Sequence, residues 1–206
     1  MSNKFSHIDD MIPVKGNMEL YITEINKMIE ETSYSFLNID EMEEISSSNS
    51  FNEINILIDN LLLSISKGDD FKNDYKSLSM SMNRLDYNDR ENITIFFIFK
   101  YQYAYNIYDV KKYEISRNQL IFEVMFLFLL ILAVYLDIIS IISCTIVFLL
   151  IIVLNKVYKY FRLKQMGTFL NFEDMRIKLL LSSTSDVFIK QVIRTLQSKV
   201  KSKPNK

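Results

Sequence analysis

Two acidic side chains interrupt the most apolar stretch of the sequence, residues 120–154. Glu123 and Asp137 lie in a run of 35 residues that is otherwise almost entirely hydrocarbon. Charged side chains are costly inside a bilayer, so they normally face protein or a water-filled path. Their spacing is about 40° short of four helical turns, so one helix would carry both on one stripe. Ser140 and Ser143 could line a facing helix, because small hydroxyl side chains permit close approach and hydrogen bonding between helices.

Two interpretations of the membrane acids follow. In the first, several hairpins associate with the acidic stripe inward and form a pore or leak for cations. In the second, the acids mark the two ends of a helix, and both reach water by snorkelling. The sequence favours the second interpretation, because Asp137 is expected at a turn and Glu123 near the inner edge of the membrane.

The other chemically versatile residues are too few for an active site. The chain has one histidine, His7, and one cysteine, Cys144, which lies inside the apolar run. Histidine-based triads and metal sites need more, and none of the glycine-rich phosphate-binding or nucleophile motifs occurs. The acidic residues at 40–44 lack the glycine and the spacing of a calcium loop. We therefore predict no catalytic residue, no metal site and no cofactor, and we expect that the protein is not an enzyme.

The apolar run is too long for a single membrane crossing. As one straight helix its 35 residues would extend about 52 Å, whereas the hydrocarbon layer is about 30 Å thick. A single span would also bury Asp137 near the middle of the membrane. We therefore predict a hairpin of two helices, at about residues 117–135 and 141–160. A single tilted helix and a hairpin that enters without crossing are the alternatives, since the expected turn has neither Gly nor Pro.

Basic residues flank the apolar run on both sides. Cytoplasmic ends of membrane helices carry an excess of lysine and arginine, and tyrosine favours the membrane–water interface. Both flanks are therefore expected in the cytoplasm, which places both termini there and the hairpin in a membrane, with the bacterial inner membrane favoured. The predicted interfacial or lipid-binding residues are Lys111, Lys112, Arg117, Lys156, Lys159, Arg162 and Lys164.

Charge is distributed unevenly along the chain. Residues 1–110 hold 19 acidic and 9 basic side chains, a net charge of −10, whereas residues 111–206 hold 6 and 15, a net charge of +9. The basic half contains the apolar run, as expected for a chain held against an anionic leaflet. A solvated acidic domain is the favoured explanation of the first half, and a charged protein partner for it is the alternative.

The N-terminal part is predicted to be helical, with one linker. Apolar residues at helical spacing follow Asn17, which can cap a helix that starts directly after it. The acidic and serine-rich stretch at residues 39–50 is the best candidate for a linker. Ser50 followed by Glu53 forms a capping-box pattern that is expected to open the next helix, and Gly68 is a natural end for that helix.

The apolar positions after this helix are spaced 4, 3, 4 and 3 residues apart, which predicts a narrow helical packing seam. An antiparallel neighbour within the same domain is its favoured partner, and an intermolecular coiled coil is the alternative. The residues of the packing seam are Phe71, Tyr75, Leu78, Met82 and Leu85.

One long helix is expected to lead from caps at Asp89 and Asn92 into the first membrane helix. The alternative is a buried strand at residues 94–99, which are β-branched or aromatic.

After the hairpin, the second membrane helix is expected to continue and to end at Gly167. Another amphipathic helix is predicted at residues 169–181, and a final helix follows a break at residues 182–185. The basic tail at residues 194–206 binds anionic lipid or is a solvated end. Nucleic acid is not an expected partner, because the tail lacks interleaved aromatic residues.

The sequence thus predicts an all-α integral membrane protein with a transmembrane helical hairpin, an N-terminal cytosolic helical domain and a C-terminal cytosolic helical tail. Residues 1–46 are expected to form an amphipathic helix and acidic linker, 47–116 a cytosolic helical domain leading into the membrane, 117–160 the hairpin, and 161–206 a basic helical region.

This layout resembles that of small bacterial two-helix membrane effectors, which permeabilise the inner membrane, in plan but not in any motif. We expect a non-enzymatic effector that oligomerises in the lipid bilayer and permeabilises or depolarises the inner membrane on a cytosolic signal. The alternative is a membrane-tethered adaptor or immunity-type protein whose acidic domain, within residues 1–110, binds a cytosolic protein. Membrane shaping by the hairpin is a third hypothesis.

Overall fold

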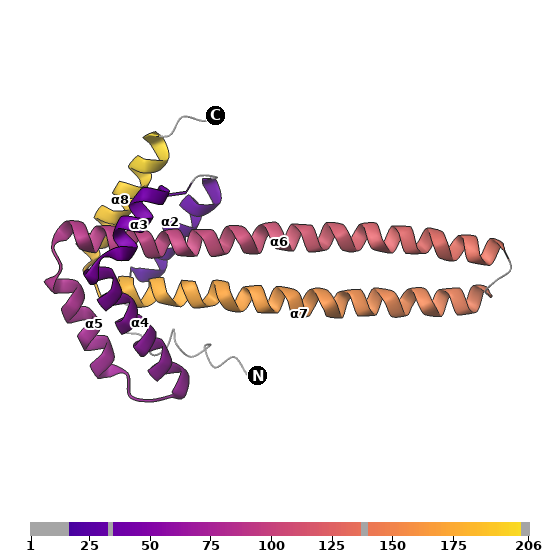
Figure 1. The fold of residues 1–206 in the computed structure, drawn as a ribbon, viewed down its shortest axis with the longest axis horizontal. Coiled ribbons are helices and arrows are strands. Elements are labelled where there is room, and N and C mark those ends of the chain that lie inside the picture. Colours follow the sequence, from indigo (N-terminus) through magenta and orange to yellow (C-terminus); the bar gives the residue numbers. More distant parts are fainter. Residues whose placement is uncertain (1–16, 33–34, 137–139, 203–206) are drawn as a thin grey trace. The chain divides into compact units, whose positions relative to one another are not determined.

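The computed structural model describes residues 17–32, 35–136 and 140–202, and every regular element in these ranges is an α-helix (Figure 1). The prediction of an all-α fold is therefore confirmed. In chain order the helices are α2 (Met18–Glu31), α3 (Ile39–Ser47), α4 (Asn49–Lys67), α5 (Lys72–Arg84), α6 (Tyr87–Tyr135), α7 (Ile141–Ser182) and α8 (Asp186–Ser202).

The described chain divides into two compact units. The multi-helix unit contains the described residues up to Tyr103 and those from Phe172 onward, and the hairpin unit contains Ala104–Asn171. Helices α6 and α7 each contribute residues to both units.

The first turns of α6 and the last turns of α7 lie in the core of the multi-helix unit, to which α2, α4, α5 and α8 also contribute buried residues. Residues 93–98 of α6 are all buried, as expected for a helix segment that is apolar around its circumference. The last turns of α7 are buried at nearly every position, and Leu179 is completely inaccessible. Helix α4 packs on α3 and α5, and α2 packs on α8.

Side chains of α5 satisfy backbone carbonyls at the end of α7. The hydroxyl of Tyr75 donates to the carbonyl of Ser182 at 2.7 Å, and Ser79 Oγ donates to the carbonyl of Ser183 at 3.2 Å. The last carbonyls of a helix have no partner within it, so these bonds fix the end of α7 against α5.

The packing seam predicted for α5 lies against helices of this same chain. Leu78 and Met82 are completely buried, and Tyr75 makes the hydrogen bond to α7 described above. Phe71 and Leu85, at the two ends of α5, are partly buried.

Residues 39–50 belong to α3 and α4 except for Ser48, which separates the two helices, so the linker predicted there is wrong. Asn38 Oδ1 accepts from the backbone N–H of Glu41 at 2.7 Å, and Glu41 Oε2 accepts from the N–H of Asn38 at 2.9 Å. This reciprocal capping box opens α3 in a stretch that reads as polar. Ile45 is buried and gives the short helix an apolar contact.

The capping box predicted for Ser50 and Glu53 is also wrong. Helix α4 begins at Asn49, and Ser48 caps it by accepting from the N–H of Phe51 at 3.1 Å. Ser50 therefore lies inside the helix, and Glu53 instead accepts from Ser81 Oγ of α5 at 2.7 Å. Nor does the side chain of Asn17 cap α2, since its amide donates to Asp186 at 3.1 Å.

The hairpin unit consists of two antiparallel helical segments that lie side by side (Figure 1). The most apolar 18-residue windows of α6 and α7 have mean hydropathies of 2.0 and 2.3, with 6% and 0% of their residues buried. Both helices are long and apolar enough to span a membrane. The predicted membrane helices match the end of α6 at Tyr135 and the start of α7 at Ile141. Asp137 and the predicted turn lie outside the described residues.

Helix α6 continues without a break into the hairpin, as predicted, but it begins at Tyr87, so the caps predicted at Asp89 and Asn92 are wrong. Both residues lie inside the helix, and Asp86 Oδ1 accepts from the N–H of Asp89 at 2.7 Å.

Helix α7 does not end at Gly167 as the sequence suggested. It runs without a break to Ser182 and includes residues 169–181. Glycine costs only about 1 kcal/mol in a helix interior, and the buried last turns of α7 offset this. A Cβ at Gly167 would lie 3.9 Å from the ring of Tyr108, so the residue lies against α6 within the hairpin unit.

We expect Gly68→Ala to destabilise the multi-helix unit by roughly 1–2 kcal/mol. Gly68 ends α4 with φ +78°, which strains any residue with a Cβ, whereas nothing lies within 4 Å of a Cβ there. Gly167→Ala is the matched control, because Ala is favoured at a helical position with room for a methyl group, and we expect it to be neutral or stabilising by up to about 1 kcal/mol. Denaturant unfolding of the full chain in detergent measures the free energy of unfolding of both variants. Equal changes would contradict the prediction that only Gly68 requires a left-handed backbone.

Candidate functional site

A row of polar side chains lies between the two helices of the hairpin unit. Lys159 Nζ donates to Ser116 Oγ at 2.9 Å, and Asn155 Nδ2 donates to Glu123 Oε1 at 3.4 Å. Gln119 Nε2 donates to the backbone carbonyl of Asn155. We name these five residues the polar seam.

The sequence places the polar seam on one face of each helix. Ser116, Gln119 and Glu123 are spaced by 3 and 4 residues, and Asn155 and Lys159 are 4 residues apart, so each set faces one neighbour. All five are half-buried, whereas adjacent apolar residues of the same helices are exposed. The two helices thus turn these five polar groups toward each other, an arrangement that is favourable for helices in a membrane.

Apolar side chains continue the same faces beyond Glu123. Leu130 is only 5% exposed, and Phe126 and Phe148 are half-buried. Helix α6 carries no further polar group until Tyr135, a distance of about 18 Å at 1.5 Å per residue. A single hairpin therefore has a polar interior near its basic flanks and an apolar one along the rest of this stretch.

Glu123 is held only loosely in the polar seam. Its partner is the neutral amide of Asn155 at 3.4 Å, which is long for a hydrogen bond to a charged acceptor. Lys159, one turn nearer the flank on α7, bonds to Ser116 instead. A carboxylate with one weak neutral partner can exchange that partner for another polar group.

The four predicted membrane-polar residues do not form one group. Ser140 and Ser143 are exposed, their hydroxyl oxygens are 3.0 Å apart, and Ser140 accepts from the N–H of Ser143 at 3.3 Å at the start of α7. Asn155 lies about 18 Å further along that helix, so the serines are not brought to Glu123. Asp137 lies outside the described residues, and the shared acidic stripe stays a prediction.

Sequence reasoning missed Gln119 and Asn155, whose amides hold the polar seam together. Their signal is spacing, since Gln119 lies one turn before Glu123 and Asn155 lies one turn before Lys159. A polar residue one helical turn from a membrane acid or base extends the same face, and it is a candidate for an interhelical hydrogen bond.

The seven predicted interfacial basic residues differ in their contacts. Lys112 and Lys156 are exposed, and neither side chain makes a hydrogen bond, ion pair or ring contact within the described part of the chain. The other five contact a neighbouring side chain: Lys111 with Glu114 at 2.6 Å, Arg117 with the Tyr113 ring at 5.9 Å, Lys159 with Ser116 at 2.9 Å, Arg162 with the Tyr158 ring at 5.8 Å, and Lys164 with the Tyr160 ring at 5.6 Å.

A second set of charged side chains lies in the multi-helix unit, where two of its members are buried and two, Asp59 and Lys100, are half-buried. Arg176 on α7 is 9% exposed and forms ion pairs with Asp59 on α4 and, at 3.4 Å, with Glu173. Glu173 is 4% exposed, and its Oε2 has no hydrogen-bond partner among the described residues. Lys100 on α6 lies 5.2 Å from the centre of the Phe96 ring. We name Asp59, Lys100, Glu173 and Arg176 the buried ionic cluster.

Burial shifts two members of this cluster toward their neutral forms. It raises the pKa of Glu173, although Arg176 and Lys100 act in the opposite direction. It lowers the pKa of Lys100, although Glu173 opposes this shift. The charged cluster therefore costs desolvation energy in the core where α4, α6 and α7 meet.

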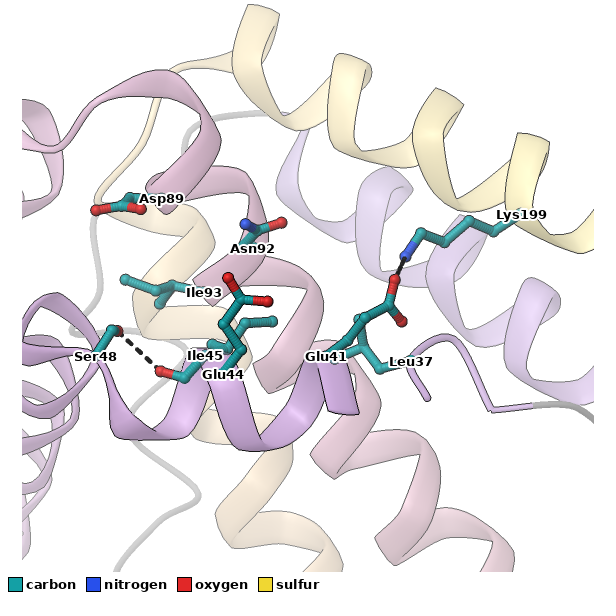
Figure 2. A pocket seen from close by; sticks show the side chains of 9 residues that line it. All are labelled: Leu37, Glu41, Glu44, Ile45, Ser48, Asp89, Asn92, Ile93 and Lys199. Atoms are coloured by element: carbon teal, nitrogen blue, oxygen red, sulfur yellow. Dashed lines mark hydrogen bonds and ion pairs between the residues drawn. The ribbon is translucent and has the colours of Figure 1, made fainter. Parts of the chain in front are cut away.

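A pocket of about 290 Å³ lies between α3, α6 and α8 in the multi-helix unit (Figure 2). Lys199 reaches Glu41 at 3.5 Å, and Asp89 accepts from Ser50 Oγ at 3.2 Å. Three carboxylates and one lysine give the pocket a negative character that suits a basic side chain. Its lining residues are Leu37, Glu41, Glu44, Ile45, Ser48, Asp89, Asn92, Ile93 and Lys199.

Comparisons of this chain with protein-family models, with curated proteins and with solved structures find no match. The features of this chain that bear on its function are the polar seam, the buried ionic cluster and the acidic pocket.

We expect Glu173→Gln to stabilise the multi-helix unit at pH 7. A raised folded-state pKa means that the ionised carboxylate costs stability above that pKa, and that the cost disappears as the pH falls toward the ordinary value of 4.5. Gln keeps the shape without the charge, so the variant should also lose this part of the pH dependence of the unfolding temperature. Asp174→Asn, in the half-exposed ion pair with Lys178, is the control and should not stabilise. A lower unfolding temperature for Glu173→Gln at pH 7 would contradict the prediction.

Proposed function

We propose that this chain is a non-enzymatic membrane effector that permeabilises or depolarises the bacterial inner membrane on a cytosolic signal. The observation that supports the proposal best is the polar seam, which contains a loosely held carboxylate between two helices whose other faces are apolar and exposed. A helix pair that served only as an anchor has no need of a carboxylate on its inner face.

In this proposal a single hairpin is closed and several copies open together. Apolar residues continue the inner face of α6 for about 18 Å beyond Glu123, so one copy offers ions no continuous polar path. Association of hairpins turns Glu123 from Asn155 toward a shared axis. The exchange forfeits a hydrogen bond worth about 0.5–1.5 kcal/mol, which new contacts between copies can replace. Carboxylates around a shared axis favour cations over anions.

Both termini lie in the cytoplasm in this proposal, and the basic flanks of the hairpin support that orientation. Arg117, Arg162 and Lys164 each lie over the ring of a tyrosine one turn earlier in the helix. Pairs of this kind suit the membrane–water interface, where a ring is partly buried and a charge remains solvated.

The second candidate function is a membrane-tethered adaptor or immunity-type protein, and the acidic pocket in Figure 2 favours it. Glu44 and Asp89 offer carboxylates to a basic side chain of a protein partner, and the apolar lining residues Ile45 and Ile93 can contact the aliphatic part of that side chain. In this alternative the hairpin only anchors the chain. Activity would then survive replacement of Glu123, whereas the effector would lose it.

Expression of the full chain in bacteria is expected to depolarise the inner membrane, as measured with a potential-sensitive dye. Glu123→Leu should reduce the rate of depolarisation by about tenfold or more, because it removes the carboxylate of the polar seam. Glu114→Gln is the matched control, since Glu114 is an acid on the same helix that pairs with Lys111 outside the seam. Membrane fractions verify equal insertion of both variants. Unchanged depolarisation by Glu123→Leu, or equal loss in the control, would argue against the effector.

Reporters fused to the two termini of the full chain test its orientation. Alkaline phosphatase is active only outside the cytoplasm and a fluorescent protein reports the cytoplasm, so both ends should give fluorescence and no phosphatase activity. The expected cause is the basic character of both hairpin flanks. Termini on opposite sides of the membrane would rule out the two-crossing arrangement.

A further inference from the structure

Lys112 is one of the two interfacial basic residues without a side-chain contact, and it lines a groove. The groove has a volume of about 460 Å³ and lies on α6 directly before the predicted membrane span. The other uncontacted base, Lys156, is not among its lining residues. The lining residues of this groove are Asp109, Val110, Lys112, Tyr113 and Ser116.

Three cationic side chains line the groove or contact residues that line it. Lys112 lies in the groove itself. The guanidinium of Arg117 lies 5.9 Å from the centre of the Tyr113 ring, and Lys159 Nζ bonds to Ser116 Oγ at 2.9 Å. Tyr113 and Ser116 are lining residues, so both contacts bring a positive charge to the wall of the groove.

The groove also carries Asp109, a carboxylate that repels an anion. An anionic group is therefore accommodated near Lys112 and Tyr113 and not throughout the groove. Lys111, next in sequence, contributes little to this preference, because it already pairs with Glu114 at 2.6 Å.

Exposed apolar residues continue from the groove along the span. Counted at 100° per residue, Leu120 and Val124 lie within about 20° of Tyr113 around the α6 axis. Both are well exposed, at 63% and 59%. A molecule with its phosphate in the groove would therefore have an exposed apolar surface next to that phosphate, on the side of the predicted span.

We propose that this groove binds the headgroup of an anionic phospholipid, with its phosphate at Lys112 and Tyr113 and an acyl chain along Leu120 and Val124. The hydroxyl-bearing headgroup of phosphatidylglycerol fits both kinds of charge, because its phosphate meets the cations and a hydroxyl can donate to Asp109. Phosphatidylcholine has no net charge and its quaternary ammonium has no donor for Asp109. The inference rests on the proposed function only in placing the hairpin in a bilayer.

Native mass spectrometry of the full chain in detergent tests the groove with three probes: phosphatidylglycerol, phosphatidylcholine and soluble glycerol phosphate. We expect the first phosphatidylglycerol to bind more tightly than phosphatidylcholine. Lys112→Gln should weaken that first binding step about fivefold, which corresponds to about 1 kcal/mol for one near-surface cation. Lys156→Gln is the matched control, with the same change of charge and likewise no lost contact, and its effect should stay below about twofold.

Three outcomes would overturn the proposal. Equal effects of the two lysine substitutions mean that the lipid is attracted to the positive charge of the chain in general and not to this groove. Equal binding of phosphatidylcholine means that the anionic headgroup is not recognised. Displacement of the lipid by glycerol phosphate at equal concentration means a site for soluble phosphate. Tyr113→Phe is a second variant, which keeps the ring beside Arg117 and should weaken binding by removing only the hydroxyl.

The effector and the lipid groove can fail separately. Depolarisation that is lost in Glu123→Leu while phosphatidylglycerol still binds selectively supports both. Selective lipid binding by a chain that never depolarises the membrane leaves the groove in place and removes the effector. Depolarisation without lipid selectivity supports the effector and removes the lipid groove.

Discussion

Hydrocarbon provides no hydrogen-bond partners, and this constraint explains the arrangement of the hairpin unit. A polar side chain on a membrane helix must find its partner within the protein or reach the interface. Glu123 and Gln119 on α6 meet Asn155 on α7, and Lys159 meets Ser116. Beyond Glu123 the exposed residues of α6 are apolar up to Tyr135, and lipid can cover them. The polar seam thus fixes which sides of the two helices face each other. Apolar contacts alone specify this pairing poorly, because lipid is as apolar as the helix surfaces.

The end of α6 at Tyr135 and the start of α7 at Ile141 were predictable because they depend on local sequence. An apolar run of 35 residues exceeds one span, and Asp137, which interrupts it, predicts where it divides. The members of the polar seam were less predictable, because Asn155 meets Glu123 only in one register of the hairpin. That register depends on the geometry of the connection and not on the composition of either helix.

Local breaker signals failed where tertiary packing outweighs them. Gly167 has low helix propensity, yet α7 continues through it to turns that are buried up to Ser182. The stretch at residues 39–50 reads as a linker by composition, yet Asn38 and Glu41 satisfy each other's backbone and Ile45 finds the core. The buried ionic cluster was invisible for the same reason, since Asp59, Lys100 and Arg176 come from three helices and meet only after those helices pack.

The two interpretations of Glu123 differ in what they require of its surroundings. Snorkelling requires that the side chain extend toward water, so its position relative to the other helix is unimportant. Glu123 is instead half-buried and accepts a hydrogen bond from Asn155 across the hairpin. Leucine at this position would be compatible with a membrane anchor and would avoid the desolvation of a carboxylate. A carboxylate kept between the helices, with one weak neutral partner, therefore favours a role in which that partner is exchanged over a role in anchoring alone.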